Sequence, residues 1–94
     1  MKISNNVEAS RLEMMLEDGS IAFVDYLMQD GHIVYTHTDV LEAHQGKGLD
    51  SQLAHEAMEY AKSNGLRVIV ECPVIARYLS KHPEYRTITY QVIE

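Results

Sequence analysis

Two glycines and a lysine stand directly before the longest amphipathic segment of the chain, in the run Gln45-Gly46-Lys47-Gly48-Leu49. The first backbone N–H groups of a helix have no partners within the helix, so such an end attracts phosphate. A glycine lets the backbone approach a bulky diphosphate closely, and Lys47 adds a positive charge. This run therefore predicts an anion-binding loop, with an ordinary glycine turn as the alternative.

The loop matches neither of two familiar nucleotide-binding motifs. The Walker pattern requires GxxxxGK followed by Ser or Thr, whereas here Gly46-Lys47 is followed by Gly48 and the position five residues before Gly46 holds Leu41. The dinucleotide fingerprint GxGxxG requires a third glycine at the position that Ser51 occupies. The spacing therefore excludes both motifs.

Cys72 is the other residue with distinctive chemistry, because a thiolate can accept an acyl group from a thioester. It ends a β-branched run that predicts a buried strand, where a cysteine is commonly a small hydrophobic residue, so both roles stay open. His37 is expected on the same strand face as Tyr35 and Asp39, as a base or as an ordinary strand histidine. Glu71 is expected to face opposite to Cys72.

Composition restricts the class of protein. With 94 residues, 46% of them hydrophobic and 23% charged, the chain predicts one globular domain over residues 1–94. The net charge of −6 argues against a nucleic-acid binder. With one cysteine, no long apolar stretch and five histidines without metal-ligand spacing, we expect a cytoplasmic protein with no disulfide, no membrane segment and no metal.

Alternating apolar and polar residues predict three strands before the loop. Residues 1–7 are expected to be a frayed start. The strands cover residues 8–17, 21–28 and 32–40, joined by turns at Asp18-Gly19 and Asp30-Gly31. An antiparallel meander results.

A helix follows the loop, because Leu49, Leu53, Ala57 and Ala61 recur every four residues, and Asn64-Gly65 ends it. The chain then predicts a strand over residues 66–72 ended by Pro73, a second helix over 74–81 and a last strand over 87–92. The inward residues of the second helix are expected to be Ile75, Ala76, Tyr78 and Leu79. The order is thus β-β-β-α-β-α-β.

This order, together with the glycine loop, resembles the GNAT acetyltransferases, which bind acetyl-coenzyme A. The run from Gln45 to Leu49 matches the first five positions of that superfamily's Gln/Arg-x-x-Gly-x-Gly/Ala motif. Asp50 departs at the sixth position, where a small residue is normal. The resemblance implies an α+β class, a minimal GNAT fold whose mixed, mainly antiparallel sheet is split to admit coenzyme A.

A closer likeness is to the very small GNAT-like proteins of the YjdJ type, which carry a cysteine and an Arg/Lys-Tyr-aliphatic run after the penultimate strand. Here the segment from Cys72 to Pro83 reads CPVIARYLSKHP. The likeness spans nearly the whole chain, from Glu8 to Tyr90. Its specificity comes from the combination of the glycine loop with the cysteine segment.

The resemblance implies that coenzyme A lies in an opening between the strands at 32–40 and 66–72. Its diphosphate would contact the amides of residues 46 to 50, its pantetheine arm the backbone of residues 40 to 42, and its thioester would lie near Cys72. The implied cofactor-binding residues are Val40, Leu41, Glu42, Gln45, Gly46, Lys47, Gly48, Leu49, Asp50 and Ser51.

Larger members of the superfamily place a tyrosine in the following helix, where it protonates the departing thiolate, within a pattern like Ala-x-x-x-Tyr-x-x-x-Gly-Phe. Read from Ala76, the tyrosine position holds Ser80. Tyr78 or Tyr85 could replace it, although a tyrosine at helical spacing among aliphatic residues is commonly part of the core. The candidate catalytic residues are Cys72, Tyr78 and His37.

The sequence thus predicts an acetyl-CoA-binding GNAT-like protein that moves acetyl to an unknown amine, small or peptidyl, with Cys72 as a candidate intermediate carrier. We expect a monomer or weak dimer without nucleic-acid or membrane partners. The alternative is a non-catalytic acyl-CoA binding or sensing module, because the usual tyrosine is missing and the chain is short. A third reading is an interaction domain with a fortuitous glycine turn.

Overall fold

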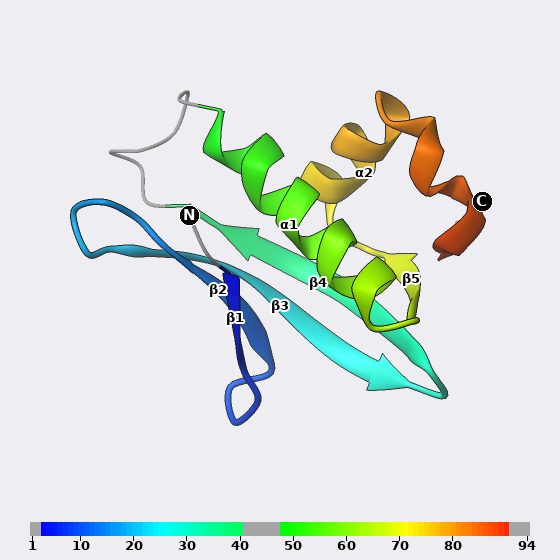
Figure 1. The fold of residues 1–94 in the computed structure, drawn as a ribbon, viewed down its shortest axis with the longest axis horizontal. Helices are drawn as coiled ribbons and strands as arrows, with labels where there is room; N and C mark the ends of the chain where they lie inside the picture. Colours follow the sequence, from blue (N-terminus) through cyan, green and yellow to red (C-terminus); the bar gives the residue numbers. More distant parts are fainter. Residues whose placement is uncertain (1–2, 41–47, 91–94) are drawn as a thin grey trace.

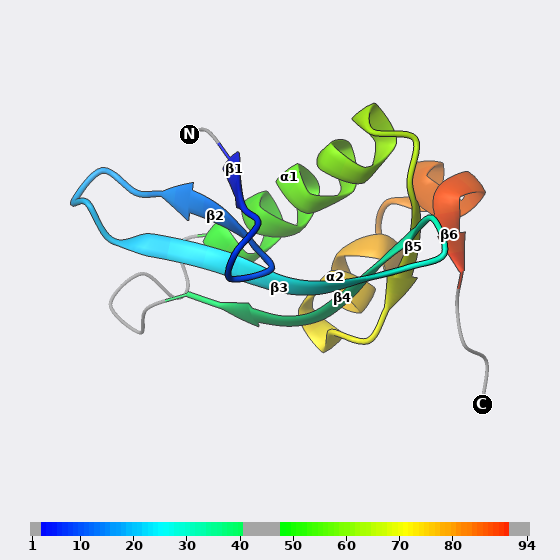
Figure 2. The same ribbon diagram turned by 90° about the horizontal axis from the view of Figure 1, so that it is seen from below.

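Helix α1 lies across one face of a twisted sheet, with helix α2 beside it (Figures 1 and 2). The computed structural model describes residues 3–40 and 48–90. In chain order the elements are β1 (Ile3–Asn6), β2 (Arg11–Met15), β3 (Ile21–Gln29), β4 (His32–Asp39), α1 (Leu49–Ser63), β5 (Arg67–Val70), α2 (Pro73–Ser80), the 3-10 helix η2 (Pro83–Ile88) and β6 (Thr89–Tyr90). They form the predicted α+β architecture.

The strands lie in the sheet in the order of the sequence, from β1 to β6. The neighbouring pairs from β1 to β4 are antiparallel, whereas β5 is parallel to both β4 and β6. The mixed, mainly antiparallel sheet is therefore confirmed. Both predicted turns are present. Their glycines, Gly19 and Gly31, have φ angles of 86° and 81°, a conformation that residues with a side chain rarely adopt.

The amino-terminal prediction is wrong, because the segment expected to be frayed contains β1. Residues Ile3 to Asn6 pair with β2, and the Asn5 side chain donates a hydrogen bond to the Tyr60 hydroxyl and accepts one from Tyr26. Hydrogen bonds of this kind produce no alternation of apolar and polar residues, so the sequence pattern does not predict the strand. The strand predicted over 8–17 is shorter as β2, because Ser10 in the preceding turn has a φ angle of 54°.

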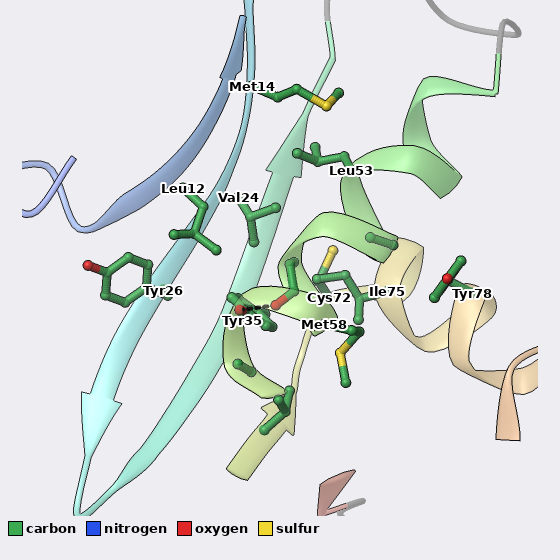
Figure 3. Close-up of a cluster of buried hydrophobic side chains, with 14 of the residues drawn as sticks. Leu12, Met14, Val24, Tyr26, Tyr35, Leu53, Met58, Cys72, Ile75 and Tyr78 are labelled. Carbon is green, nitrogen blue, oxygen red and sulfur yellow. Dashed lines mark hydrogen bonds between the residues drawn. The ribbon is translucent and has the colours of Figure 1, made fainter. Parts of the chain in front are cut away.

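The apolar face of α1 forms the centre of the core, as its four-residue spacing predicted. Leu53, Ala57, Met58 and Ala61 are fully buried, together with Ala54, which the pattern missed. Tyr35 of β4 donates its hydroxyl to the Ala57 carbonyl oxygen at 2.6 Å (Figure 3). Burial raises the pKa of Tyr35 above its ordinary value. This contact fixes the middle of α1 on the sheet.

A β-bulge in β4 changes which side chains face α1. Tyr35 pairs with Tyr26 and His37 pairs with Asp25, so Thr36 is an extra residue on β4. Because side chains alternate along a strand, the extra residue reverses the alternation after Tyr35. Thr38, which pairs with the buried Val24, therefore lies on the core side of the sheet.

The carboxyl-terminal elements differ from the prediction at their boundaries. β5 ends at Val70, and Pro73 occupies the first turn of α2, where its missing N–H costs nothing. Ile75, Tyr78 and Leu79 are buried as expected, whereas Ala76 is exposed. Of the strand predicted over 87–92, the first two residues belong to the end of η2, and Thr89–Tyr90 form β6. Residues 91 and 92 lie outside the described residues.

Candidate functional site

The sheet opens between β4 and β5. The two strands pair over only four positions, from His32 with Arg67 to Tyr35 with Val70. The Glu71 N–H then donates to the Tyr35 carbonyl at 3.0 Å, after which the chain turns into α2 while β4 continues to Asp39. The end of β4 beyond Tyr35 is therefore not paired with β5. This is the opening that the resemblance implied.

Cys72 lies at this opening and contacts β4. Its thiol donates a hydrogen bond to the hydroxyl of Thr38, with the sulfur and oxygen 3.6 Å apart. The side chain is only 2% exposed, and Figure 3 shows it among the core residues between α1 and the sheet. Cys72 is also the residue that precedes α2, whose first turn contains Pro73. The first free backbone N–H groups of α2 therefore belong to Val74 and Ile75.

His37 does not share a face with Tyr35, so that prediction is wrong. The bulge at Thr36 turns His37 away from the core, where it is exposed and pairs across the sheet with Asp25. Glu71 is exposed while Cys72 is buried, as their alternation predicted. Sequence reasoning missed Thr38 for the same reason that it misplaced His37, since nothing in the residue pattern marks the bulge.

The described part of the glycine loop is the amino end of α1. Gly48 is the residue before the helix, with a φ angle of 76°, and its carbonyl accepts the first helical hydrogen bond, from Gln52. The N–H groups of the first three helical residues, Leu49 to Ser51, therefore point out of the helix end, which has no side-chain cap. A Cβ added at Gly48 would meet none of the described atoms within 4 Å. Within residues 3–40 and 48–90 these N–H groups have no hydrogen-bond partner, so they are candidates for contacting a ligand.

The other predicted cofactor-binding residues divide into two groups. Val40 is described and is buried in the core, with 5% of its surface exposed. Leu41, Glu42, Gln45, Gly46 and Lys47 lie outside the described residues.

Tyr78 and Tyr85 belong to a network that joins α1, α2 and η2. The Tyr78 hydroxyl is hydrogen-bonded to Nδ1 of His55 at 3.0 Å, and Tyr85 donates to the Glu59 carboxylate at 2.5 Å. Burial raises the pKa of both tyrosines, and the bond to Glu59 raises that of Tyr85 further. Figure 3 shows Tyr78 well apart from Cys72. The structure thus brings Cys72 together with Thr38, and Tyr78 together with His55.

Ser80 occupies the position at which larger GNAT enzymes would carry the acid. It is exposed, and its hydroxyl donates to the Arg77 carbonyl at 2.7 Å. A serine hydroxyl held in this way is a poor proton donor to a distant thiolate, because its proton is already committed to the helix backbone.

Two cavities flank α2. A small cleft of about 60 Å³ lies between the first turn of α1 and the outer side of α2, and it is lined by Asp50, Ser51, Val74, Arg77, Tyr78, Lys81 and His82. A larger cavity of about 550 Å³ is lined by Leu79, Ser80, His82, Pro83, Tyr85, Arg86 and Thr89. The cleft, despite its size, is the one that contains predicted cofactor-binding residues, Asp50 and Ser51. Its cations Arg77 and Lys81 were not predicted, although their spacing of four residues places them on one helix face.

Across residues 3–40 and 48–90, no three His, Cys, Asp or Glu side chains are grouped so that they could hold a metal ion. Within the same ranges no helix is long and apolar enough to cross a membrane.

Comparisons with known proteins agree with this architecture. The model of the GCN5-related N-acetyl-transferase family matches residues 11–88. The solution structure of a GCN5-like candidate N-acetyltransferase from Staphylococcus aureus superposes with a TM-score of 0.65 at 21% identity, covering 99% of this chain and 91% of that one. No curated protein matches the sequence.

The family match covers the strands that form the opening, the helix that follows the glycine loop, and Cys72. The structural match covers nearly the whole chain and shows the same fold. This chain therefore belongs to the GCN5-related N-acetyltransferase family.

Proposed function

We propose that this protein binds acetyl-coenzyme A and transfers the acetyl group to an amine through Cys72. The observation that carries the proposal is the position of the Cys72 thiol, at the opening between β4 and β5 and in contact with Thr38. In this family the acyl donor is expected in that opening. Because the Cys72 thiol lies at this opening, it is the proposed nucleophile for the thioester of the bound acyl donor.

Binding is supported by the two ends of the proposed ligand path. At one end, the N–H groups of Leu49 to Ser51 leave the amino end of α1 and carry a partial positive charge that attracts a diphosphate. At the other end, the part of β4 beyond Tyr35 has an edge that β5 does not use, and an extended pantetheine arm can add to it like a short strand.

The proposed chemistry needs two balanced steps. The Cys72 sulfur attacks the thioester carbonyl, a new carbon–sulfur bond forms, the bond to the coenzyme A sulfur breaks, and the proton from Cys72 passes to the departing thiolate. The amine nitrogen then attacks the carbonyl carbon of the Cys72 thioester, a carbon–nitrogen bond forms, the carbon–sulfur bond to Cys72 breaks, and a proton from the amine returns to the Cys72 sulfur. Thr38 orients the thiol, and the N–H groups of Val74 and Ile75 are donors for the negative oxygen that develops in each step.

His37 and Tyr78 stay predicted catalytic residues. His37 is exposed on the sheet face away from Cys72, and Tyr78 is bonded to His55. Neither contacts the Cys72 thiol. The net charge of −6 favours a cationic acceptor, since long-range attraction raises its local concentration.

A second candidate function is a non-catalytic acyl-CoA binding or sensing module. It is favoured by the low exposure of Cys72 and by the commitment of Ser80 to the Arg77 carbonyl, which leaves no acid beside the expected thiolate among the described residues.

Mass spectrometry separates the two functions. The full chain is incubated with acetyl-CoA, digested, and compared with the Cys72→Ser variant, before and after addition of a primary amine. The proposal predicts acetyl on Cys72, its absence in the variant, and acetylated amine with loss of the adduct. Binding of acetyl-CoA without an adduct and without acetylated amine would establish the module instead.

A further inference from the structure

The small cleft beside α1 concentrates positive charge in an acidic protein. Arg77 lies in α2 and Lys81 directly follows its last residue; both are exposed, and both line the cleft. Within residues 3–40 and 48–90, neither forms an ion pair. Two neighbouring cations repel each other, and the chain has only eight Lys and Arg residues for 14 Asp and Glu, so a pair of cations in one cleft is unusual here. The arrangement suits an anion that is bound from outside.

We propose that Arg77 and Lys81 form a subsite for a phosphate monoester, and that this subsite makes the protein selective for a 3′-phosphorylated adenosine nucleotide. The inference rests on the proposed binding of coenzyme A, which carries such a monoester in addition to its diphosphate. It assigns the two phosphate groups to different partners, the diphosphate to the α1 backbone and the monoester to α2.

The chemistry of the two sites supports this division. The end of α1 offers backbone N–H groups and the Ser51 side chain, which suit a diphosphate of low charge density. A phosphate monoester carries close to two negative charges at neutral pH and is best neutralised by mobile side-chain cations. Lysine supplies a point charge and arginine a planar fork of donors. Their exposure matches the end of a ligand that faces solvent.

Replacing Asp50 is expected to have the opposite effect on phosphate affinity to replacing Arg77 or Lys81. The Asp50 carboxylate lines the same cleft, where its negative charge repels a phosphate. The same charge lies in the first turn of α1 and stabilises the helix through its dipole. His82, the remaining titratable residue of the cleft apart from Tyr78, is bonded to Glu84 at 3.3 Å and stacks on Tyr78. His82 therefore forms a wall of the cleft, and the proposed phosphate ligands are Arg77 and Lys81.

The test compares coenzyme A with 3′-dephospho-coenzyme A by isothermal titration calorimetry. The full chain is measured alongside Arg77→Gln, Lys81→Gln, Asp50→Asn and the control Arg86→Gln. Arg86 is exposed and lines the other cavity, so its replacement changes the net charge by the same amount as Arg77→Gln. Because all these side chains are exposed or at a helix end, thermal melts are expected to stay close to that of the unmodified chain.

The unmodified chain is expected to bind coenzyme A about tenfold more tightly than the dephospho form, as a charge-assisted hydrogen bond predicts. Arg77→Gln and Lys81→Gln should each remove most of that preference without weakening the dephospho form, and Asp50→Asn should strengthen coenzyme A binding. Arg86→Gln should change neither affinity. Equal affinity of the unmodified chain for both nucleotides, or equal weakening of both by the α2 variants, overturns the subsite and leaves the proposed function standing. Failure of the unmodified chain to bind either nucleotide overturns both.

Discussion

At the scale of single residues, the contact between Cys72 and Thr38 depends on one extra residue in β4. Without the bulge at Thr36, Thr38 would point away from the core and His37 would take its side of the sheet. The sequence identified Cys72 from its chemistry and its place after a β-branched run. It could not identify Thr38, because a bulge depends on how two strands pair and leaves no mark in the residue pattern of one.

Replacing Thr38 tests its role as the positioning residue for Cys72. Thr38→Val keeps the shape of the side chain and removes the oxygen that accepts the hydrogen bond from the Cys72 thiol. We expect acetylation of Cys72 to slow about fivefold, the equivalent of one ordinary hydrogen bond, with little change in the affinity for coenzyme A. The rate is measured by mass spectrometry at several acetyl-CoA concentrations.

The matched control is Thr36→Val, because the Thr36 hydroxyl also makes one hydrogen bond, to the Asp25 carbonyl, away from Cys72. An equal decrease of the acetylation rate in both variants would show that Thr38 acts only through the stability of β4.

At the scale of elements, the start of α1 is the part of the candidate site whose backbone the sequence predicted best. Two glycines before a periodic run are a local signal, and both the helix and the left-handed backbone at Gly48 follow from local chemistry. The strand β1, the length of β6 and the opening between β4 and β5 depend on partners distant in sequence. Only the resemblance to a family implied the opening.

Gly48→Ala separates ligand binding from backbone strain. A residue with a Cβ at a φ angle of 76° is expected to lower the free energy of unfolding by about 1 kcal/mol. The added methyl group meets no described atom within 4 Å and stands where the proposed diphosphate approaches, so coenzyme A binding should weaken by more than the change in stability explains. Urea unfolding and calorimetric titration give the two quantities.

Gly65→Ala is the control, because Gly65 lies just beyond the other end of α1 with a φ angle of 66° and is equally free of neighbours. It should lose a similar amount of stability and bind coenzyme A normally. If the two variants bind equally well, the ligand does not approach Gly48.

The contact between Tyr35 and α1 predicts how stability changes with pH. Because burial raises the pKa of Tyr35 in the folded protein above its ordinary value of 10, its contribution is fully present below pH 10. Above that pH the unfolded chain loses the proton first, so the free energy of unfolding should fall as the pH rises.

Tyr35→Phe should cost about 1 kcal/mol at neutral pH, because the bond to the Ala57 carbonyl is lost. It should also make the alkaline decrease in stability shallower. Urea unfolding at neutral and alkaline pH tests both statements, and an unchanged alkaline slope in the variant would exclude Tyr35 as its main cause.

At the scale of the whole molecule, the proposed binding mode uses a thiol, a helix end and a pair of cations. In that proposal coenzyme A runs from the opening beside Cys72 to the first turn of α1 and on to the cleft beside α2. The large cavity beside η2 lies outside this path and contains none of the predicted cofactor-binding residues. Family membership and fold were predictable from the sequence, since they rest on the order of elements and the glycine loop. The division of phosphate contacts between α1 and α2 was not, because it requires the packing of the two helices.

The most direct test of the account is a titration of the full chain with acetyl-CoA, followed by the shifts of backbone amide resonances. Coenzyme A bound as proposed should shift the amides of Gly48 to Ser51, those of Thr36 to Asp39, and those of Cys72 and Val74, with small effects on residues 83–88. Shifts confined to the cavity beside η2, or none at millimolar ligand, would contradict the proposed site.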